Sequence, residues 1–147
     1  MRIEAQSGTA AGRSEPMPRA NFERWAISDD YSTLREHVKR GARLASISGE
    51  RLEDLALAVH EAVVNVIEHG GGRGELTMWH DGTDLVIEVS DEKGELTAAH
   101  LRAGPPPPPS KGGGRGLWLI HQICDEVVIS RRVGRSTVRM RTRMGIA

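Results

Sequence analysis

Three polar side chains suited to a metal and phosphate site recur at a spacing of four residues. These are Glu61, Asn65 and His69. If the segment is a helix, in which successive residues turn by about 100°, Asn65 and His69 lie about 40° and 80° around the axis from Glu61. A carboxylate and a carboxamide one turn apart suit Mg²⁺, whose other ligands are water and phosphate oxygens. The alternative is an ordinary solvated helix face, so this interpretation requires a phosphate site nearby.

A glycine-rich run later in the chain is a candidate for that phosphate site. It consists of Gly112, Gly113, Gly114, Arg115 and Gly116, and the apolar residue Leu117 follows directly. Glycines let backbone N–H groups approach an anion, and the helix predicted to follow presents its positive end. The alternative is a flexible loop after a proline-rich linker. The run is neither the dinucleotide-binding pattern nor the phosphate loop of common NTPases, which requires Gly-Lys-Ser/Thr.

A carboxylate at the end of a predicted strand is the third candidate. Asp91 follows a segment of alternating apolar residues, Leu85 to Val89, and therefore closes a predicted strand at the edge of a sheet. There it could accept a hydrogen bond from an amine. The alternative is a turn-forming aspartate beside Gly94.

The elements that must hold these groups follow from periodicity and turn residues. Apolar residues recur at spacings of three and four from 50 to 69, which predicts an amphipathic helix ended by Gly70-Gly71-Gly72. Further helices are predicted from a cap at Ser28 or Asp29 to Leu44, from 117 to about 124, and over a short segment at 97–102. Strands are predicted at 20–27, 75–80, 84–90, 126–133 and 136–142.

These elements predict an α/β (α+β) two-layer sandwich. Asp81-Gly82-Thr83 and Gly134-Arg135 each join two strands as a hairpin. Strands paired mostly through hairpins and separated by helices indicate a mixed, largely antiparallel sheet with helices on one face.

Composition limits the domain organisation and the class of partner. The 147 residues suffice for one domain at 20–147, preceded by a leader at 1–19 that has little to bury and is expected to be disordered. Twenty basic residues balance twenty acidic ones, so no overall field favours nucleic acid or a membrane. Cys124 is the single cysteine, and no apolar run approaches the roughly 18 residues of a membrane span. A cytoplasmic protein is expected.

The order of the motifs resembles a known family. Glu-x-x-x-Asn-x-x-x-His-Gly begins at Glu61, Asp91-Glu92-Lys93-Gly94 follows, and Gly-Gly-Arg-Gly-Leu-Trp-Leu begins at Gly113. This pattern is similar to the anti-sigma-factor serine/threonine kinases of bacterial partner-switching systems, within the ATPase superfamily that includes gyrase and histidine kinases. The match covers about 22–143, and the implied fold is the Bergerat fold.

The resemblance implies a role for each matched residue. Asn65 would ligate Mg²⁺, Glu61 would be the base that orients the attacking hydroxyl, and Asp91 would pair with the adenine amino group. Thr137 would assist Asp91. Residues 112–117 would wrap the phosphates of ATP, with 105–111 as a shortened lid, and His69 has no assigned role.

One departure from the family affects the adenine site. The family's second motif reads Asp-x-Gly-x-Gly, whereas Lys93 and Glu95 occupy the two glycine positions here. Lys93 is expected either to narrow the pocket or to require a backbone conformation that glycine adopts more readily. Weak ATP binding and loss of catalysis both stay open.

The leading hypothesis is a kinase that uses Mg·ATP to phosphorylate an anti-sigma-factor antagonist of the STAS type and that also holds a sigma factor inactive. The alternative is a non-catalytic nucleotide-binding module that sequesters a regulatory partner. A histidine-kinase fragment is disfavoured because the region before 20 offers no phosphoacceptor helix hairpin. The sequence does not identify the sigma factor, the antagonist or the upstream signal, and it leaves a homodimer open.

Overall fold

The computed structural model describes residues 2–7, 19–95 and 115–145. The short helix predicted at 97–102, the proline run and the glycines 112–114 lie outside this part of the chain. The described strands and helices are β1 (Arg2–Ser7), β2 (Ala20–Ala26), α1 (Tyr31–Leu44), α2 (Gly49–His69), β3 (Gly74–His80), β4 (Asp84–Asp91), α3 (Arg115–Ile123), β5 (Glu126–Arg132) and β6 (Arg135–Arg143).

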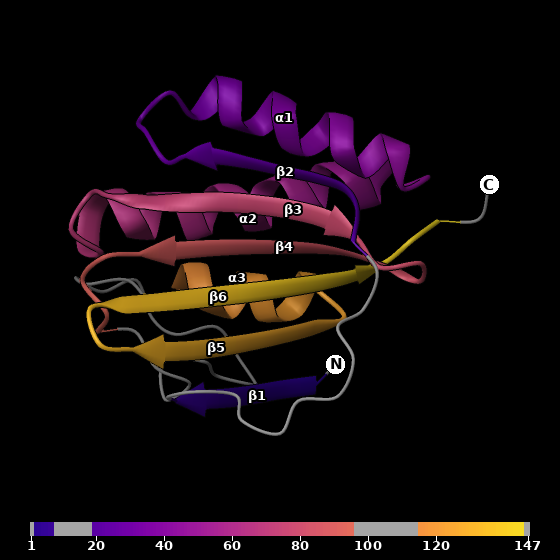
Figure 1. The fold of residues 1–147 in the computed structure, drawn as a ribbon. Helices are drawn as coiled ribbons and strands as arrows, with labels where there is room; N and C mark the ends of the chain where they lie inside the picture. The colour runs from indigo at the N-terminus through magenta and orange to yellow at the C-terminus, as the bar shows by residue number, and fades with distance from the viewer. Residues whose placement is uncertain (1, 8–18, 96–114, 146–147) are drawn as a thin grey trace.

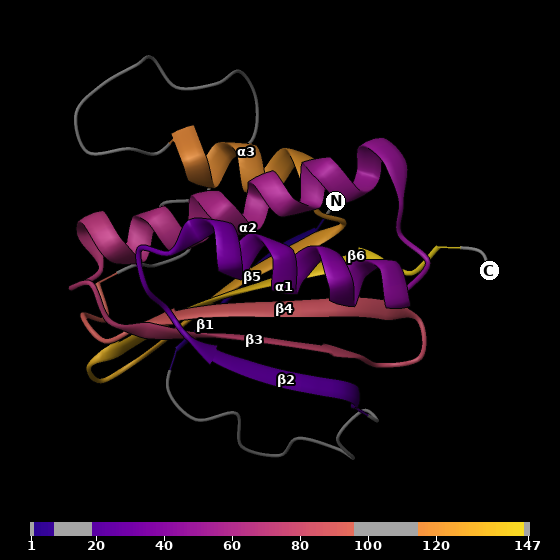
Figure 2. The ribbon, with the colours of Figure 1, turned by 90° about the horizontal axis from the view of Figure 1, so that it is seen from above.

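The described strands form one sheet of six, in the order β1-β5-β6-β4-β3-β2. Neighbouring strands from β5 to β2 are antiparallel, and β1 lies parallel to β5. The three described helices cover the same face of the sheet (Figures 1 and 2). This arrangement confirms the predicted two-layer α/β sandwich with helices on one face. None of the described helices is both long and apolar enough to cross a membrane.

The hydrophobic core lies between the helices and the sheet. Alternate residues of β4 face the helices, because side chains along a strand point to opposite faces in turn. The buried core includes residues of α2, β4 and β6 that the apolar pattern had assigned to it, among them Leu55, Val59, Val63, Leu85, Ile87, Val89, Val138 and Met140. α2 packs between α1 and α3 (Figure 2), so both of its flanks are held by neighbouring helices.

The start of α1 differs from the prediction, whereas the end of α2 agrees with it. Asp30 caps α1, in place of Ser28 or Asp29, because its Oδ1 accepts the N–H of Thr33 at 3.2 Å. α2 ends at His69 as predicted, and Gly71 supplies the left-handed conformation with φ of +89°.

Two expectations about which residues form strands were wrong. Arg2–Ser7 forms β1 and pairs with β5 from Arg2↔Glu126 to Ser7↔Arg131, whereas the sequence had predicted a disordered leader there. That prediction counted only apolar burial and neglected backbone hydrogen bonding to an open strand edge. Val133, predicted to share a strand face with Val127, lies fully exposed in the β5–β6 turn.

The face of the sheet opposite the helices carries a network of charges centred on Arg141. Its guanidinium contacts Asp81, and it lies 3.4 Å from Asp84 Oδ2 and from Glu126 Oε1. Burial of Asp81 disfavours its charged form, but hydrogen bonds from Arg141 and from the backbone N–H groups of Asp84 and Thr83 outweigh burial and lower the pKa of Asp81 to about 2. The network ties the β3–β4 turn to β6.

We predict that Asp81→Asn lowers the free energy of unfolding at pH 7 by about 1–3 kcal/mol, because a buried charged hydrogen bond is lost. The folded-state pKa of about 2 lies below the usual 3.8. The stabilisation is therefore present above that usual value and disappears as pH falls through the folded-state value. Urea unfolding of both proteins should show a difference that narrows from pH 4 to pH 2.

Asp54 provides the matched control, because it is exposed on α2. Asp54→Asn should change stability by less than about 0.5 kcal/mol. A difference between wild type and Asp81→Asn that stays constant down to pH 2 would contradict the ionic role of Asp81.

Candidate functional site

Asp91 is buried at the end of β4, where it organises the turn that follows. Its Oδ1 accepts the backbone N–H of Lys93 at 3.0 Å and that of Gly94 at 2.8 Å. The side chain is only 7% exposed. Within the described part of the chain, the second oxygen, Oδ2, has no hydrogen-bond partner. One oxygen of the carboxylate therefore fixes the turn, and the other remains able to accept from a bound amine.

The end of α2 approaches Asp91 closely because Gly70 has no side chain. A Cβ atom built on Gly70 would lie 2.8 Å from Asp91 Cβ and 3.0 Å from Val66 Cα. Real Cβ atoms do not approach that closely, so any larger residue at this position would push the helix end and Asp91 apart. This contact explains why a glycine follows His69 in the first motif.

The departure at Lys93 has less effect on the backbone than the sequence suggested. Gly94, not Lys93, adopts the left-handed conformation, with φ of +71°. A Cβ atom on Gly94 would lie 2.6 Å from the backbone nitrogen of Arg135, so glycine is required there for space as well. The expectation that Lys93 needs a glycine-like conformation was therefore wrong.

The side chain of Lys93 lies on the rim of this turn. Its Cβ is 3.7 Å from where a Cβ on Gly71 would be, and its Nζ lies 3.6 Å from Glu95 Oε2. Both charged side chains are largely exposed, so the pair contributes little to stability. Lys93 thus lies beside the glycine turn that follows α2, and its charge is directed to solvent and Glu95.

Glu61 lies against the start of α3. A Cβ on Gly116 would be 3.5 Å from Glu61 Oε2, which places the backbone after the glycine run beside this carboxylate. Leu117 is buried in the core and anchors the first turn of α3. Arg115 begins α3, and the predicted cradle residues 112–114 lie outside the described residues. Helix packing therefore brings the third motif to the first.

Glu61, Asn65 and His69 form a polar stripe along α2, on the side away from its buried residues, as the sequence predicted. Glu61 and Asn65 are half-buried, and His69 is exposed at the end of the helix, whereas Val59, Val63 and Val66 are buried. Among the described residues, no group of three or more His, Cys, Asp or Glu side chains could hold a metal ion. A cation beside Asn65 would therefore need oxygens from a bound phosphate or water.

Thr137 does not lie beside Asp91. It pairs with Ser90 across β4 and β6, while Asp91 pairs with Ser136. Directly opposite residues share a face of the sheet, so Ser136 points to the helix side with Asp91 and Thr137 points to the other side. The sequence prediction for Thr137 was wrong by one residue, which in a strand reverses the face.

Thr137 instead lines a pocket of about 200 Å³ on the helix-free face. Ser90, Thr77 and Arg135 also line this pocket, so it is separated from Asp91 by the sheet itself. Ser136 is 1% exposed and was missed by sequence reasoning. The sequence pattern that could have identified Ser136 is its alternation with the apolar residues Val138 and Met140, because these alternate residues are the helix-facing positions of β6.

Comparison with known proteins gives a consistent match. Residues 25–142 match the family described as the histidine kinase-like ATPase domain. The chain is 30% identical over 105 residues to the serine-protein kinase RsbW of Oceanobacillus iheyensis, covering 63% of this chain and 66% of that protein. It is 27% identical over 119 residues to RsbW of Halalkalibacterium halodurans, covering 74% of each. It is 33% identical over 109 residues to RsbW of Listeria innocua, covering 66% of this chain and 69% of that protein.

Proposed function

The chain belongs to the histidine kinase-like ATPase domain family, and from that premise we propose that it is a protein serine/threonine kinase that uses Mg·ATP. The family implies ATP binding, and the relatives are each named a serine-protein kinase. The proposed phosphate acceptor is an anti-sigma-factor antagonist of the STAS type. In its other state the chain would hold a sigma factor inactive.

One observation carries the proposal: the motif that begins at Asp91 and the glycine-rich motif before Leu117 contact α2 at two separate points. Asp91 lies against Gly70 at the end of the helix, and Gly116 lies against Glu61 further back. Gly70 follows Glu61 by nine positions, which corresponds to about 13.5 Å along the helix axis. A nucleotide lying along α2 would have its base at Asp91 and its terminal phosphate near Glu61.

The roles of the individual residues follow from this orientation. Oδ2 of Asp91 would accept a hydrogen bond from the adenine amino group, with Ser136 beside it on the same face. Asn65 lies between the two contact points and would ligate Mg²⁺ together with phosphate oxygens. The backbone from Gly112 to Leu117 would surround the phosphates, with the positive end of α3 directed at them.

Transfer of the phosphate would depend on positioning and charge neutralisation. Mg²⁺ would supply the neutralising charge, and Glu61 would accept the proton of the attacking hydroxyl or orient that hydroxyl. The rival function is a module that sequesters a partner without catalysis, for which Lys93 in place of the family glycine was the main argument. The ordinary backbone conformation of Lys93 weakens that argument.

The adenine assignment predicts a contrast between two neighbouring residues. Ser136→Ala should weaken ATP binding about 2- to 10-fold, the effect of one lost hydrogen bond, because Ser136 shares the face of Asp91. Thr137→Ala should leave affinity within about twofold, because Thr137 lies on the opposite face. Isothermal titration calorimetry measures both. Equal losses in the two variants, or a loss only in Thr137→Ala, would refute the assignment.

The kinase assignment predicts that Glu61→Gln lowers phosphate transfer to the antagonist by a factor on the order of 10² or more. Affinity for Mg·ATP and for the sigma factor should persist, since the side chain keeps its shape. Radiolabelled phosphate transfer measures the rate, and a pull-down measures sigma-factor binding.

Glu68→Gln is the matched control, because Glu68 is exposed on the same helix, and it should transfer phosphate at the wild-type rate. If wild type binds a partner tightly but phosphorylates no antagonist at any concentration of Mg·ATP, the sequestering module replaces the kinase.

A further inference from the structure

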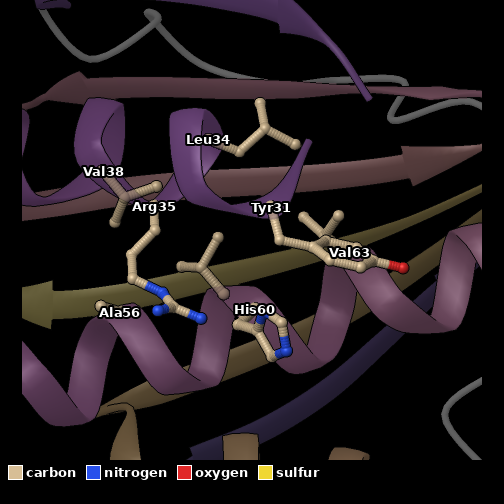
Figure 3. Close-up of a pocket in the computed structure, with 8 residues that line it drawn as sticks. Tyr31, Leu34, Arg35, Val38, Ala56, His60 and Val63 are labelled. Carbon is tan, nitrogen blue, oxygen red and sulfur yellow. The ribbon is translucent and has the colours of Figure 1, made fainter. Parts of the chain in front are cut away.

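Of two hollows in the described part of the chain, only one has room for a small polar molecule. The groove between α1 and α2 is lined mostly by apolar side chains, among them Leu34, Val38 and Val63, and its volume is about 10 Å³ (Figure 3). That volume holds roughly one water molecule. The second hollow, the sheet pocket, is the one that Thr137 lines on the helix-free face, and it has a volume of about 200 Å³ and a mainly polar and charged lining. It lies on the side of the sheet away from Asp91.

Strand pairing builds the floor of the sheet pocket. Ser90 of β4 lies opposite Glu75 of β3 and opposite Thr137 of β6, and Thr77 lies opposite Glu88 in the next row. Directly opposite residues, and residues two apart along a strand, share a face of a sheet, so these five side chains all point to the helix-free side. Three of them carry a hydroxyl group, which can donate a hydrogen bond to an oxygen of a ligand. The backbone of three adjacent strands therefore holds three donors in fixed relative positions.

Three arginines surround this floor, namely Arg19, Arg24 and Arg135. The guanidinium of Arg19 lies over the ring of Trp79, 4.3 Å from its centroid, an arrangement that leaves the N–H groups at the edge of the guanidinium available for hydrogen bonds. Arg24 Nε lies 3.9 Å from Glu75 Oε2, and Arg135 Nη1 lies 3.7 Å from Glu75 Oε1. Both distances are too long for a hydrogen bond. The two guanidiniums thus share one carboxylate loosely and retain donors for a ligand.

The positive charges of the sheet pocket exceed the negative charges that can neutralise them. Glu88 also lines the pocket, but its Oε2 is held at 2.7 Å by the Nε of Arg139, which lies outside the lining. Among the described residues, Glu75 is then the remaining carboxylate that faces the three arginines, so three positive charges and one negative charge leave an excess of two. Charges of one sign that line a hollow attract an oppositely charged molecule from solution. The pocket is therefore suited to an anion.

We propose that the sheet pocket binds a small polyanion, a molecule that carries at least two carboxylate or phosphate groups. Guanidiniums pair with such groups through two parallel hydrogen bonds, and the hydroxyl groups of the floor donate to the remaining oxygens. The volume of about 200 Å³ is below the roughly 300–1,000 Å³ of sites for drug-sized ligands. The ligand is therefore smaller than ATP, and its site is distinct from the proposed nucleotide site on the other face of the sheet.

Calorimetric titration of the wild-type chain with citrate, and separately with pyrophosphate, tests the proposal. Mg²⁺ and nucleotide are left out, so that the result does not depend on the proposed function. One molecule of polyanion should bind per chain, and its affinity should fall as sodium chloride is raised, because the attraction is between charges. Binding of citrate alone would identify carboxylate ligands, binding of pyrophosphate alone would identify phosphate ligands, and either result supports the site.

Charge variants separate the sheet pocket from the rest of the surface. Arg135→Gln removes one positive charge from the pocket and should weaken polyanion binding at least tenfold, because a charged hydrogen bond is lost. Arg43→Gln makes the same change at an exposed position of α1, which covers the other face of the sheet (Figure 2). This control should change the affinity less than twofold.

Two neighbouring residues of β6 distinguish the two faces of the sheet. Thr137→Val keeps the shape of the side chain but removes a floor hydroxyl, so it should weaken polyanion binding about 2- to 10-fold. Ser136→Ala changes the helix side and should leave polyanion binding within about twofold. Melting temperatures check that each variant is folded. The proposal is overturned by the absence of saturable binding of either probe at millimolar concentration, by equal affinity in wild type and Arg135→Gln, or by a larger loss in Ser136→Ala than in Thr137→Val.

Discussion

The position of β4 between β3 and β6 is the constraint on which the rest of the site depends. Its register places Asp91 opposite Gly74 on one side and opposite Ser136 on the other, at the last pair of both ladders. From there the carboxylate faces the helix layer, and the absence of a side chain on Gly70 lets the end of α2 approach it. A shift of this register by one residue would turn Asp91 to the helix-free face and remove the site.

α2 connects this end of the sheet to the start of α3. The helix carries the candidate base and the candidate metal ligand on its polar stripe, while its buried valines attach it to the core. Because packing against both flanking helices fixes its rotation, Glu61 is held beside the backbone of Gly116. The backbone at Gly116, which begins the described part of the proposed phosphate-binding region, is thus positioned by packing between α2 and α3.

Much of this arrangement could be predicted from local patterns. The spacing of apolar residues in α2, the Asp-Gly turn and the alternation in β4 each report a period that one element alone determines. Thr137 shows where such reasoning fails, because the face of a residue depends on the register between strands and not on its own sequence. β1 is similar, since its pairing depends on an open edge of β5 that no property of residues 2–7 reveals. The effect of Lys93 also required the structure, because only the backbone shows that Gly94 takes the strained position.

The central claim is that α2, Asp91 and the backbone at the start of α3 form one Mg·ATP site. Calorimetric titration of the wild-type chain with ATP, in the presence of Mg²⁺ and again with a chelator, tests this claim most directly. The account predicts saturable binding of one nucleotide per chain that Mg²⁺ strengthens, and loss of that strengthening in Asn65→Ala with the fold intact. No saturable heat at millimolar Mg·ATP, or the same affinity with and without Mg²⁺, would contradict it.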